Sequence, residues 1–171
     1  MSQERIQRRL AAILFADVVG YSRLTGQDEV GTWRRLQSVL QNMVRPSIKA
    51  HAGRVVRIKG DGILVEFASA VEAVASAVAM QQAMAQRNAN VLDTHRIELR
   101  IGINLGDIVT TVDDVHGDGV NVAARLEPLA EPGGICVSAT VFEHVRAKLA
   151  YPFEERGIQS LKNIADPVRI Y

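Results

Sequence analysis

The sequence of 171 residues predicts an α+β fold, and two observations carry that prediction. Strand-like and helix-like patterns follow one another in the order β-α-β-β-α-β, with further helix and strand patterns behind them. In mid-chain, Gly60-Asp61-Gly62 joins two short strand patterns as a tight hairpin. This hairpin forces an antiparallel pair, which argues against a doubly wound parallel sheet. The order is that of a ferredoxin-like sheet with helices on one face.

The first elements are a strand and a long helix. Residues 10–19 form a nearly continuous apolar run, typical of a strand buried on both faces. Asp28 is placed to cap the helix, and Pro46 with Gly53 marks its far end. Side chains expected on its buried face recur mostly at three- and four-residue steps: Trp33, Leu36, Leu40, Met43 and Val44.

Sequence patterns in the middle of the chain predict the hairpin and a second helix. Residues 55–59 and 63–67 are the two hairpin strands. Ser69 and Glu72 form a capping box that opens an alanine-rich helix to about residue 87. Residues 97–105 and 108–112 are expected to be another strand pair, with Gly106-Asp107 between them.

The last third predicts shorter elements. Asp118 is expected to cap a helix that carries Asn121 and Arg125. A short strand at 135–137 follows, and Thr140 with Glu143 forms a capping box for a helix to about residue 149. The tail, residues 153–171, is read as two or three short strands.

Composition narrows the class of protein. The length suits a single domain, with its core at about 9–171, and hydrophobic residues make up 47% of it. A net charge of +1 gives no sign of a nucleic-acid surface, and no apolar run reaches the roughly 18 residues of a membrane span. The single Cys136 excludes an internal disulfide and favours the cytoplasm. Because residues 168–171 still read as a strand, we expect either a domain excised from a longer protein or a truncated product.

Two aspartates are candidate metal ligands. Asp17 ends the first strand, where it caps a loop or ligates a cation, and the amides of Gly20, Tyr21 and Ser22 behind it can bind an anion. Asp61 suits a tight hairpin on conformational grounds alone. In a ferredoxin-like sheet, however, we expect the first strand beside the strand that opens this hairpin, so the two carboxylates face each other. Mg²⁺ or Mn²⁺ would relieve their repulsion in a two-metal site.

Asn121 and Arg125 are candidate nucleotide ligands. They lie four residues apart and share one helix face. Their neighbours are largely apolar, so the helix is expected to be mostly buried, and a buried guanidinium needs an anion. A phosphate is one candidate for that anion, and Glu127 or another acidic side chain is the other. The alternative to a buried pair is an exposed polar stripe along the helix.

Together these motifs resemble the catalytic domain of class III adenylate/guanylate cyclases of the bacterial type. The resemblance covers about residues 9–171, and the motifs that carry it are residues 17–22 (DVVGYS), 60–62 (GDG), 117–125 (GDGVNVAAR) and 161–164 (LKNI). It implies conversion of ATP to 3′,5′-cyclic AMP and pyrophosphate, with two Mg²⁺ or Mn²⁺ ions per site. It further implies a head-to-tail homodimer, in which each site takes its metals from one chain and its nucleotide-binding groups from the other.

The resemblance also assigns roles to single residues. Asp17, Asp61 and the backbone carbonyl of Val18 would hold the metals, and the amides of Gly20, Tyr21 and Ser22 would hold the distal phosphates. Asp114 would accept a hydrogen bond from the adenine amino group, and Asn121 would orient the ribose. Arg125 would stabilise the α-phosphate, and Lys162 would bind phosphate.

One position departs from the family pattern. Where the family has its adenine-selecting lysine, this chain has Arg57, and the nearest lysine is Lys59 on the same strand face. Arg57 can still donate to a ring nitrogen of adenine, although its forked group is not a conservative replacement. The glutamate and cysteine usual in guanylate cyclases of the family are absent, which favours ATP over GTP. A catalytically silent nucleotide-binding domain is the main alternative, and a diguanylate cyclase is disfavoured because its hairpin signature is missing.

Overall fold

The computed structural model describes residues 6–171, and its elements confirm the predicted βαββαβ order. The first half contains β1 (Gln7–Val18), α1 (Tyr21–Gln27), α2 (Glu29–Val39), a π-helical turn (Leu40–Val44), α3 (Arg45–Ala50), β2 (Arg54–Lys59), β3 (Gly62–Phe67) and α4 (Ala70–Ala89). The second half contains a 3-10 turn (Asp93–His95), β4 (Leu99–Thr110), β5 (Val115–His116), α5 (Asp118–Leu126), a 3-10 turn (Glu127–Leu129), β6 (Ile135–Val137), α6 (Ala139–Val145), β7 (Ile158–Gln159) and β8 (Val168–Arg169).

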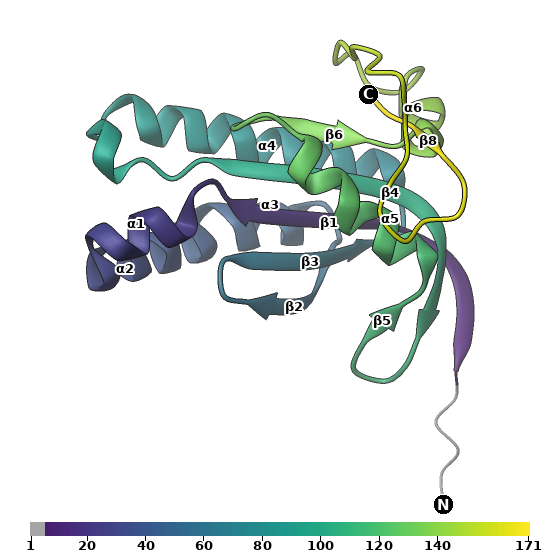
Figure 1. Ribbon diagram of the computed structural model, residues 1–171, viewed down its shortest axis with the longest axis horizontal. Helices are drawn as coiled ribbons and strands as arrows, with labels where there is room; N and C mark the ends of the chain where they lie inside the picture. The colour runs from purple at the N-terminus through teal and green to yellow at the C-terminus, as the bar shows by residue number, and fades with distance from the viewer. Residues whose placement is uncertain (1–5) are drawn as a thin grey trace, which may run out of the picture.

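The main sheet has the strand order β2-β3-β1-β4-β5, and β6 pairs with β4 in parallel. Figure 1 shows the long strands β1 and β4 side by side through the middle of the molecule, where they pair along their whole length. The strand that lies beside β1 is β3, which follows the hairpin turn, and not β2, which opens it. That expectation was therefore wrong in detail, although β3 still brings the turn next to the end of β1.

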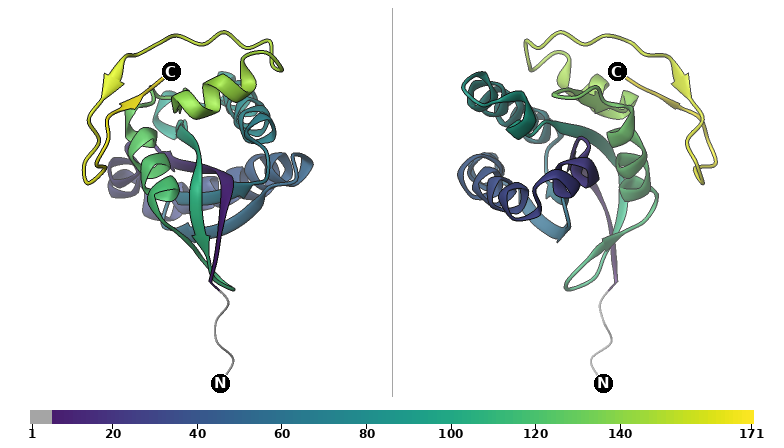
Figure 2. Two further views of the ribbon diagram at one scale, coloured as in Figure 1. Left: turned by 90° about the vertical axis from the view of Figure 1, so that its right-hand side faces the viewer. Right: turned by 60° about the vertical axis from the view of Figure 1, so that its left-hand side comes forward.

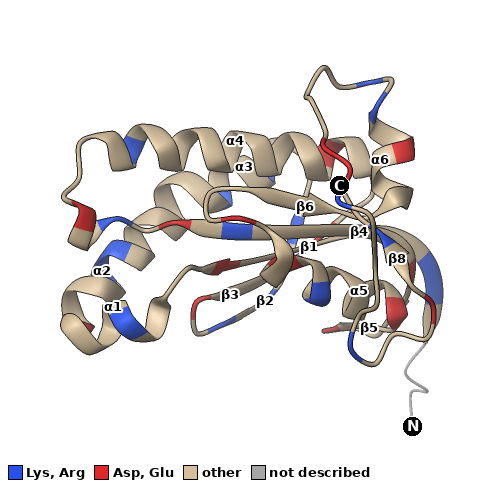
Figure 3. Ribbon diagram, turned by 45° about the horizontal axis from the view of Figure 1, so that its top comes forward, with Lys and Arg blue, Asp and Glu red and all other residues tan. Residues whose placement is uncertain are grey.

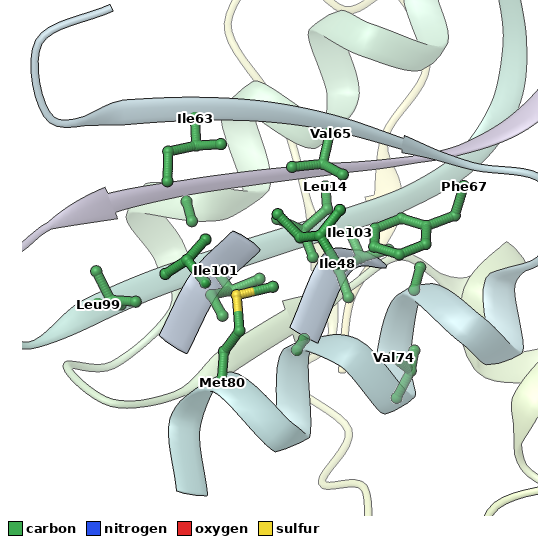
Figure 4. Packing of buried hydrophobic residues seen from close by; sticks show 14 of the residues in the cluster. Leu14, Ile48, Ile63, Val65, Phe67, Val74, Met80, Leu99, Ile101 and Ile103 are labelled. Atoms are coloured by element: carbon green, nitrogen blue, oxygen red, sulfur yellow. The ribbon is translucent and has the colours of Figure 1, made fainter. Parts of the chain in front are cut away.

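Helices cover the two faces of this sheet unequally. Helices α1 to α4 lie on one face, and α5 lies on the other with the C-terminal segment beside it (Figure 2). The larger hydrophobic core fills the space under α2 to α4, where Leu14, Val65 and Ile103 of the sheet meet Ile48 and Met80 (Figure 4). A second, smaller cluster lies under α5.

Several helix ends follow their capping residues as predicted. Asp28 accepts a hydrogen bond from Gly31 N at 3.0 Å and begins α2, and the Ser69 side chain accepts from Glu72 N and begins α4. Other ends differ. Gly117, not Asp118, is the N-cap of α5. Helix α6 begins after Ser138 rather than at the Thr140 capping box, and it ends at residue 145.

The helix after Asp28 does not end at Pro46. A π-helical turn precedes this proline, and α3 carries the helical path on to residue 50. Proline lacks the amide hydrogen that an α-helix needs, and the wider π turn accommodates this local change. Trp33, expected on the buried face, is 56% exposed.

Strand β4 is continuous from Leu99 to Thr110, so the predicted turn at Gly106-Asp107 is wrong. Both residues pair with β1 in register, at Ala11 and Leu10. Helix α5 packs closely over this point, because a Cβ on Gly119 would lie 2.6 Å from Asp107 O and 3.1 Å from Gly106 C. Within residues 6–171, no helix combines the length and apolarity needed to cross a bilayer.

Candidate active site

Asp17 and Asp61 lie in one corner of the sheet, as predicted. Strands β1 and β3 pair up to Ala16 and Ile63, so the β2–β3 turn sits beside the end of β1. The Asp61 carboxylate accepts a hydrogen bond from Val18 N at 3.1 Å. Figure 3 shows acidic positions at the end of β1, at this turn and at the nearby end of α5. Two carboxylates from separate segments therefore meet at the edge of the α5 face.

Alternation along β1 decides which face Asp17 occupies. Ala11 and Ile13 pack under α5, and Phe15 packs against the same cluster, so Asp17 continues that row. The residues that alternate with this row belong to the core under α2 to α4: Ala12, Leu14 and Ala16. The aspartate thus lies on the face of the sheet that α4 leaves open.

Glu127, at the end of α5, is a third carboxyl group at this corner. It is only 8% exposed, and its side chain is hydrogen-bonded to Asp17. Burial raises the pKa of Glu127 well above its usual range, and the hydrogen bond and charge of Asp17 raise it further. Arg100, opposite Asp17 on β4, lowers this pKa but does not offset the burial. Glu127 therefore ionises less readily than an exposed glutamate and lies beside Asp17.

Gly102 allows the end of α5 to come this close. It lies on β4 opposite Phe15, directly beneath the helix. A Cβ at this position would lie 2.4 Å from Glu127 N and 2.8 Å from Ala123 O, both backbone atoms that cannot give way cheaply. The absence of a side chain at Gly102 thus sets the height of α5 above the sheet and the position of Glu127.

The oxygen donors of this corner suit a hard divalent cation. Mg²⁺ and Mn²⁺ prefer carboxylate and carbonyl oxygens, which Asp17, Asp61 and the backbone of Val18 can offer. In the part of the chain that the structure describes, no three His, Cys, Asp or Glu side chains converge as a ready-made metal centre. The donors present fit an ion that takes its remaining ligands from a bound molecule or water.

The residues predicted to bind distal phosphates form the start of α1. Gly20 is its N-cap with a φ of 63°, a left-handed conformation that favours glycine. No side chain caps this end, so the first amides of the helix, including those of Tyr21 and Ser22, point to the end of β1 without a side-chain acceptor. They lie directly after the strand that carries Asp17.

Arg57 and Asp114 meet although they come from opposite edges of the sheet. Arg57 is on β2, and Asp114 is in the turn between β4 and β5. Arg57 Nη1 donates to Asp114 Oδ2 at 3.4 Å, and Val115 N donates to Asp114 Oδ1 at 2.8 Å. Arg57, rather than Lys59, is thus the cation placed beside the predicted adenine-binding aspartate.

Asn121 and Arg125 share one face of α5, as predicted, but that face is exposed. The opposite face is buried, with Val120 and Ala123 packed against β1. The expectation of a buried guanidinium was therefore wrong. Within residues 6–171, Arg125 forms no ion pair. Glu127, which was one candidate for its anion, lies beside Asp17. Both predicted nucleotide ligands point away from the sheet that carries Asp17.

Lys162 lies in the loop between β7 and β8 and is exposed. The preceding Leu161 packs with Val122 and Leu126 of α5 in a small third cluster. Figure 2 shows this loop running beside α5. The structure therefore brings Lys162 to the same helix as Asn121 and Arg125, from a segment about forty residues further along the chain.

Comparison with known proteins shows the family of this chain. Residues 4–171 match the model of the adenylate and guanylate cyclase catalytic domain. The chain belongs to this family. A Rhizobium meliloti protein named "Putative adenylate cyclase 3" is 48% identical over all 171 residues, which span 29% of its length.

Solved structures from the cyclase family share the fold closely. An adenylate/guanylate cyclase/hydrolase from Silicibacter pomeroyi is 43% identical, with a TM-score of 0.92 over 97% of this chain and 96% of that one. The guanylyl cyclase Cya2 is 29% identical, with a TM-score of 0.82 over 96% of this chain and 91% of that one. Fold similarity therefore extends to cyclases named for either base.

The motifs at residues 17–22, 60–62, 117–125 and 161–164 do not include three residues that the structure adds to this region. These are Arg100, Glu127 in its contact with Asp17, and His116 beside Asp114. A signal for Glu127 was present, because it follows Val120 and Ala123 at helical steps of seven and four and so continues the sheet-facing stripe. Arg125 falls outside that stripe.

Proposed function

We propose that this domain is an adenylate cyclase that converts ATP to 3′,5′-cyclic AMP and pyrophosphate at a homodimer interface. The observation that carries the proposal is the meeting of Asp17 and Asp61 at the end of β1, in a chain of the cyclase family. Glu127, whose pKa is raised by burial, lies beside Asp17 at this corner. Asp17 and Asp61, as a pair of carboxylates at one strand end, suit a site built for metal ions.

Asp17, Asp61 and the Val18 carbonyl would hold two Mg²⁺ or Mn²⁺ ions. When bound, such ions lower the pKa of a coordinated hydroxyl and neutralise charge on a polyphosphate. The amides of Gly20, Tyr21 and Ser22 would receive the distal phosphates at the start of α1. In the reaction, the ribose O3′ bonds to the α-phosphorus, and the bond to the departing pyrophosphate breaks in line.

The remaining groups would come from a second copy. The buried face of α5 packs on its own sheet, so Asn121 and Arg125 project from the opposite face and away from Asp17 of the same chain. A partner in a head-to-tail dimer would bring the same face over the metal-binding corner, and the dimer would carry two such sites. Asn121 would then orient the ribose, and Arg125 and Lys162 would stabilise phosphate charge.

Base choice rests on Arg57 and Asp114. Asp114 offers a carboxylate that accepts hydrogen bonds, so it can pair with the 6-amino group of adenine. It would repel the 6-carbonyl of guanine, which is also an acceptor. Arg57, held beside it, can donate to a ring nitrogen. This pairing supports ATP as the substrate. A weakly active or silent domain would keep the same pair but form no product.

The proposal is tested by incubating the purified domain with Mn²⁺ and either ATP or GTP, at several protein concentrations, and identifying products by mass. We expect cyclic AMP from ATP, with a rate that rises faster than linearly with protein. A parallel reaction with EDTA controls for metal dependence. Cyclic GMP as the main product would overturn the base assignment, and binding of ATP without product would identify a silent domain.

A further inference from the structure

The side chain of Asp114 lies within 3.4 Å of three polar groups. Val115 N donates to its Oδ1 at 2.8 Å. Its Oδ2 faces Arg57 Nη1 at 3.4 Å and His116 Nε2 at 3.4 Å. The backbone turn that presents it is closed by Thr111 N, which donates to the Asp114 carbonyl at 3.0 Å. One oxygen is thus committed to the protein's own backbone, and the other remains available to side chains and ligand.

The two side chains on Oδ2 differ in origin. Arg57 comes from β2, at the far edge of the sheet, whereas His116 belongs to β5 and lies two residues from Asp114. Asp114 and His116 therefore belong to the same short segment of the chain. Arg57 approaches independently from another segment, and its long side chain can leave the carboxylate without disturbing the turn.

Recognition of adenine needs a change at this cluster. A carboxylate oxygen has two lone pairs, so Oδ2 can accept from two donors at once with good geometry but is crowded by three. If Arg57 turns to donate to a ring nitrogen, the 6-amino group can take its place on Oδ2. His116 Nε2 would then be the protein group left on that oxygen, which fixes its direction.

We propose that His116 is a positioning residue for base recognition, which holds Asp114 Oδ2 toward the exocyclic amino group of the purine once Arg57 has turned to the ring. This inference rests on the proposed function for the identity of the base-binding site. It predicts that the contribution of His116 appears only with purines that carry a 6-amino group. A residue needed merely for folding would affect all nucleotides equally.

The test measures binding of 3′-deoxy-ATP and of 3′-deoxy purine riboside 5′-triphosphate, which lacks the 6-amino group, by isothermal titration calorimetry with Mg²⁺. Neither ligand has the 3′-hydroxyl, so turnover cannot interfere. For His116→Ala, we expect the affinity for 3′-deoxy-ATP to fall about 3- to 10-fold, because one partly exposed polar contact to a charged group is lost. Affinity for the purine riboside ligand should change less than about 2-fold, within the range of a neutral surface substitution.

Three further variants separate positioning from structure. His116→Gln retains a donor near the place of Nε2 and should restore most of the preference for the 6-amino ligand. Asp114→Ala should abolish the preference, and adding His116→Ala to it should cause no further loss, because the histidine acts through that carboxylate. His95→Ala, at an exposed histidine in the 3-10 turn after α4, is the matched control and should behave as the wild type.

Failure of this inference and failure of the proposed activity are distinguishable. If wild type shows no preference for the 6-amino ligand, or if His116→Ala keeps that preference, the role of His116 is overturned. If the preference behaves as expected but no cyclic AMP forms from ATP, the positioning role stands and the proposed cyclase activity fails.

Discussion

The Asp61 carboxylate accepts a hydrogen bond from the Val18 amide at 3.1 Å, although 43 residues separate the two along the chain. This bond ties the β2–β3 turn to the end of β1. It directs the Asp61 side chain to the strand end where Asp17 lies, and so brings together the two carboxylates of the proposed metal site. The turn itself is set locally by Gly60, whose φ of 61° is left-handed.

Replacing Asp61 by Asn separates this structural role from metal binding. The amide oxygen of Asp61→Asn can still accept from Val18, but its charge is gone. We expect cyclic AMP formation to fall roughly 100-fold or more, since bound cations supply several kcal/mol of charge stabilisation. The midpoint of thermal unfolding, measured by circular dichroism, should stay close to that of wild type. Activity above half of the wild-type rate would contradict the assignment.

Arg57 is expected to serve as a donor rather than a bulky spacer. Arg57→Lys keeps a positive donor beside Asp114 and should retain kcat/KM for ATP. Arg57→Met keeps much of the length without the donor and should lower kcat/KM about 10-fold, as expected when one polar contact to a base is lost. Initial rates with ATP across a range of concentrations measure both. Equal values for the Met variant and wild type would remove Arg57 from the base site.

Gly102 should tolerate no side chain. In Gly102→Ala, the Cβ would lie 2.4 Å from Glu127 N, so α5 must shift. We expect the free energy of unfolding in urea to fall by about 1–3 kcal/mol, as in other overpacked sites. Gly26→Ala is the control, because nothing lies within 4 Å of its Cβ, and alanine should stabilise α1 by up to about 1 kcal/mol. Similar stability for both variants would show that α5 adjusts freely.

Cys136 should be unreactive in the folded protein and should make stability pH-dependent at high pH. The thiol is 4% exposed, and burial raises its pKa from 9.0 to about 11. Between these values the unfolded chain loses the proton while the folded chain keeps it. Stability from this group is therefore fully present below pH 9 and falls as pH rises, by at most about 1.4 kcal/mol per pH unit.

Urea unfolding of wild type and Cys136→Ala at pH 8.5 and 10.5 measures this contribution. The advantage of wild type over the alanine variant should shrink at the higher pH. A difference that does not change with pH would contradict the raised pKa. A disulfide reagent at pH 8 should label the Cys136 thiol only when the protein unfolds.

Local sequence signals predicted much of the fold and of the site. The hairpin at Gly60 and the capped starts of α2 and α4 depend on neighbouring residues, and all were confirmed. Gly106 misled because a glycine followed by an aspartate suits a turn, whereas here both residues continue an unbroken strand against which Gly119 of α5 packs. The strand continues because it pairs with β1, which is distant in sequence, so no local pattern indicates it.

The site shows the same limit. The residues in the motifs could be named, but their exposure could not be read from nearby apolar neighbours, as Arg125 shows. Whether α5 buries one face or another depends on where the sheet lies, and Trp33 on α2 was misplaced for the same reason. The ion pair of Arg57 with Asp114 depends on the curvature that brings opposite sheet edges together, which is a property of the whole domain.

The most direct test of the shared site is complementation between two inactive variants. Asp17→Ala lacks a metal ligand, and Arg125→Ala lacks the group expected from the partner chain. Alone, each should be inactive. Mixed in equal amounts, they should recover about a quarter of wild-type activity, because half the dimers are mixed and each mixed dimer holds one intact site. No recovery, with exchange of subunits proven by mass spectrometry of the intact dimers, would contradict a site built from two chains.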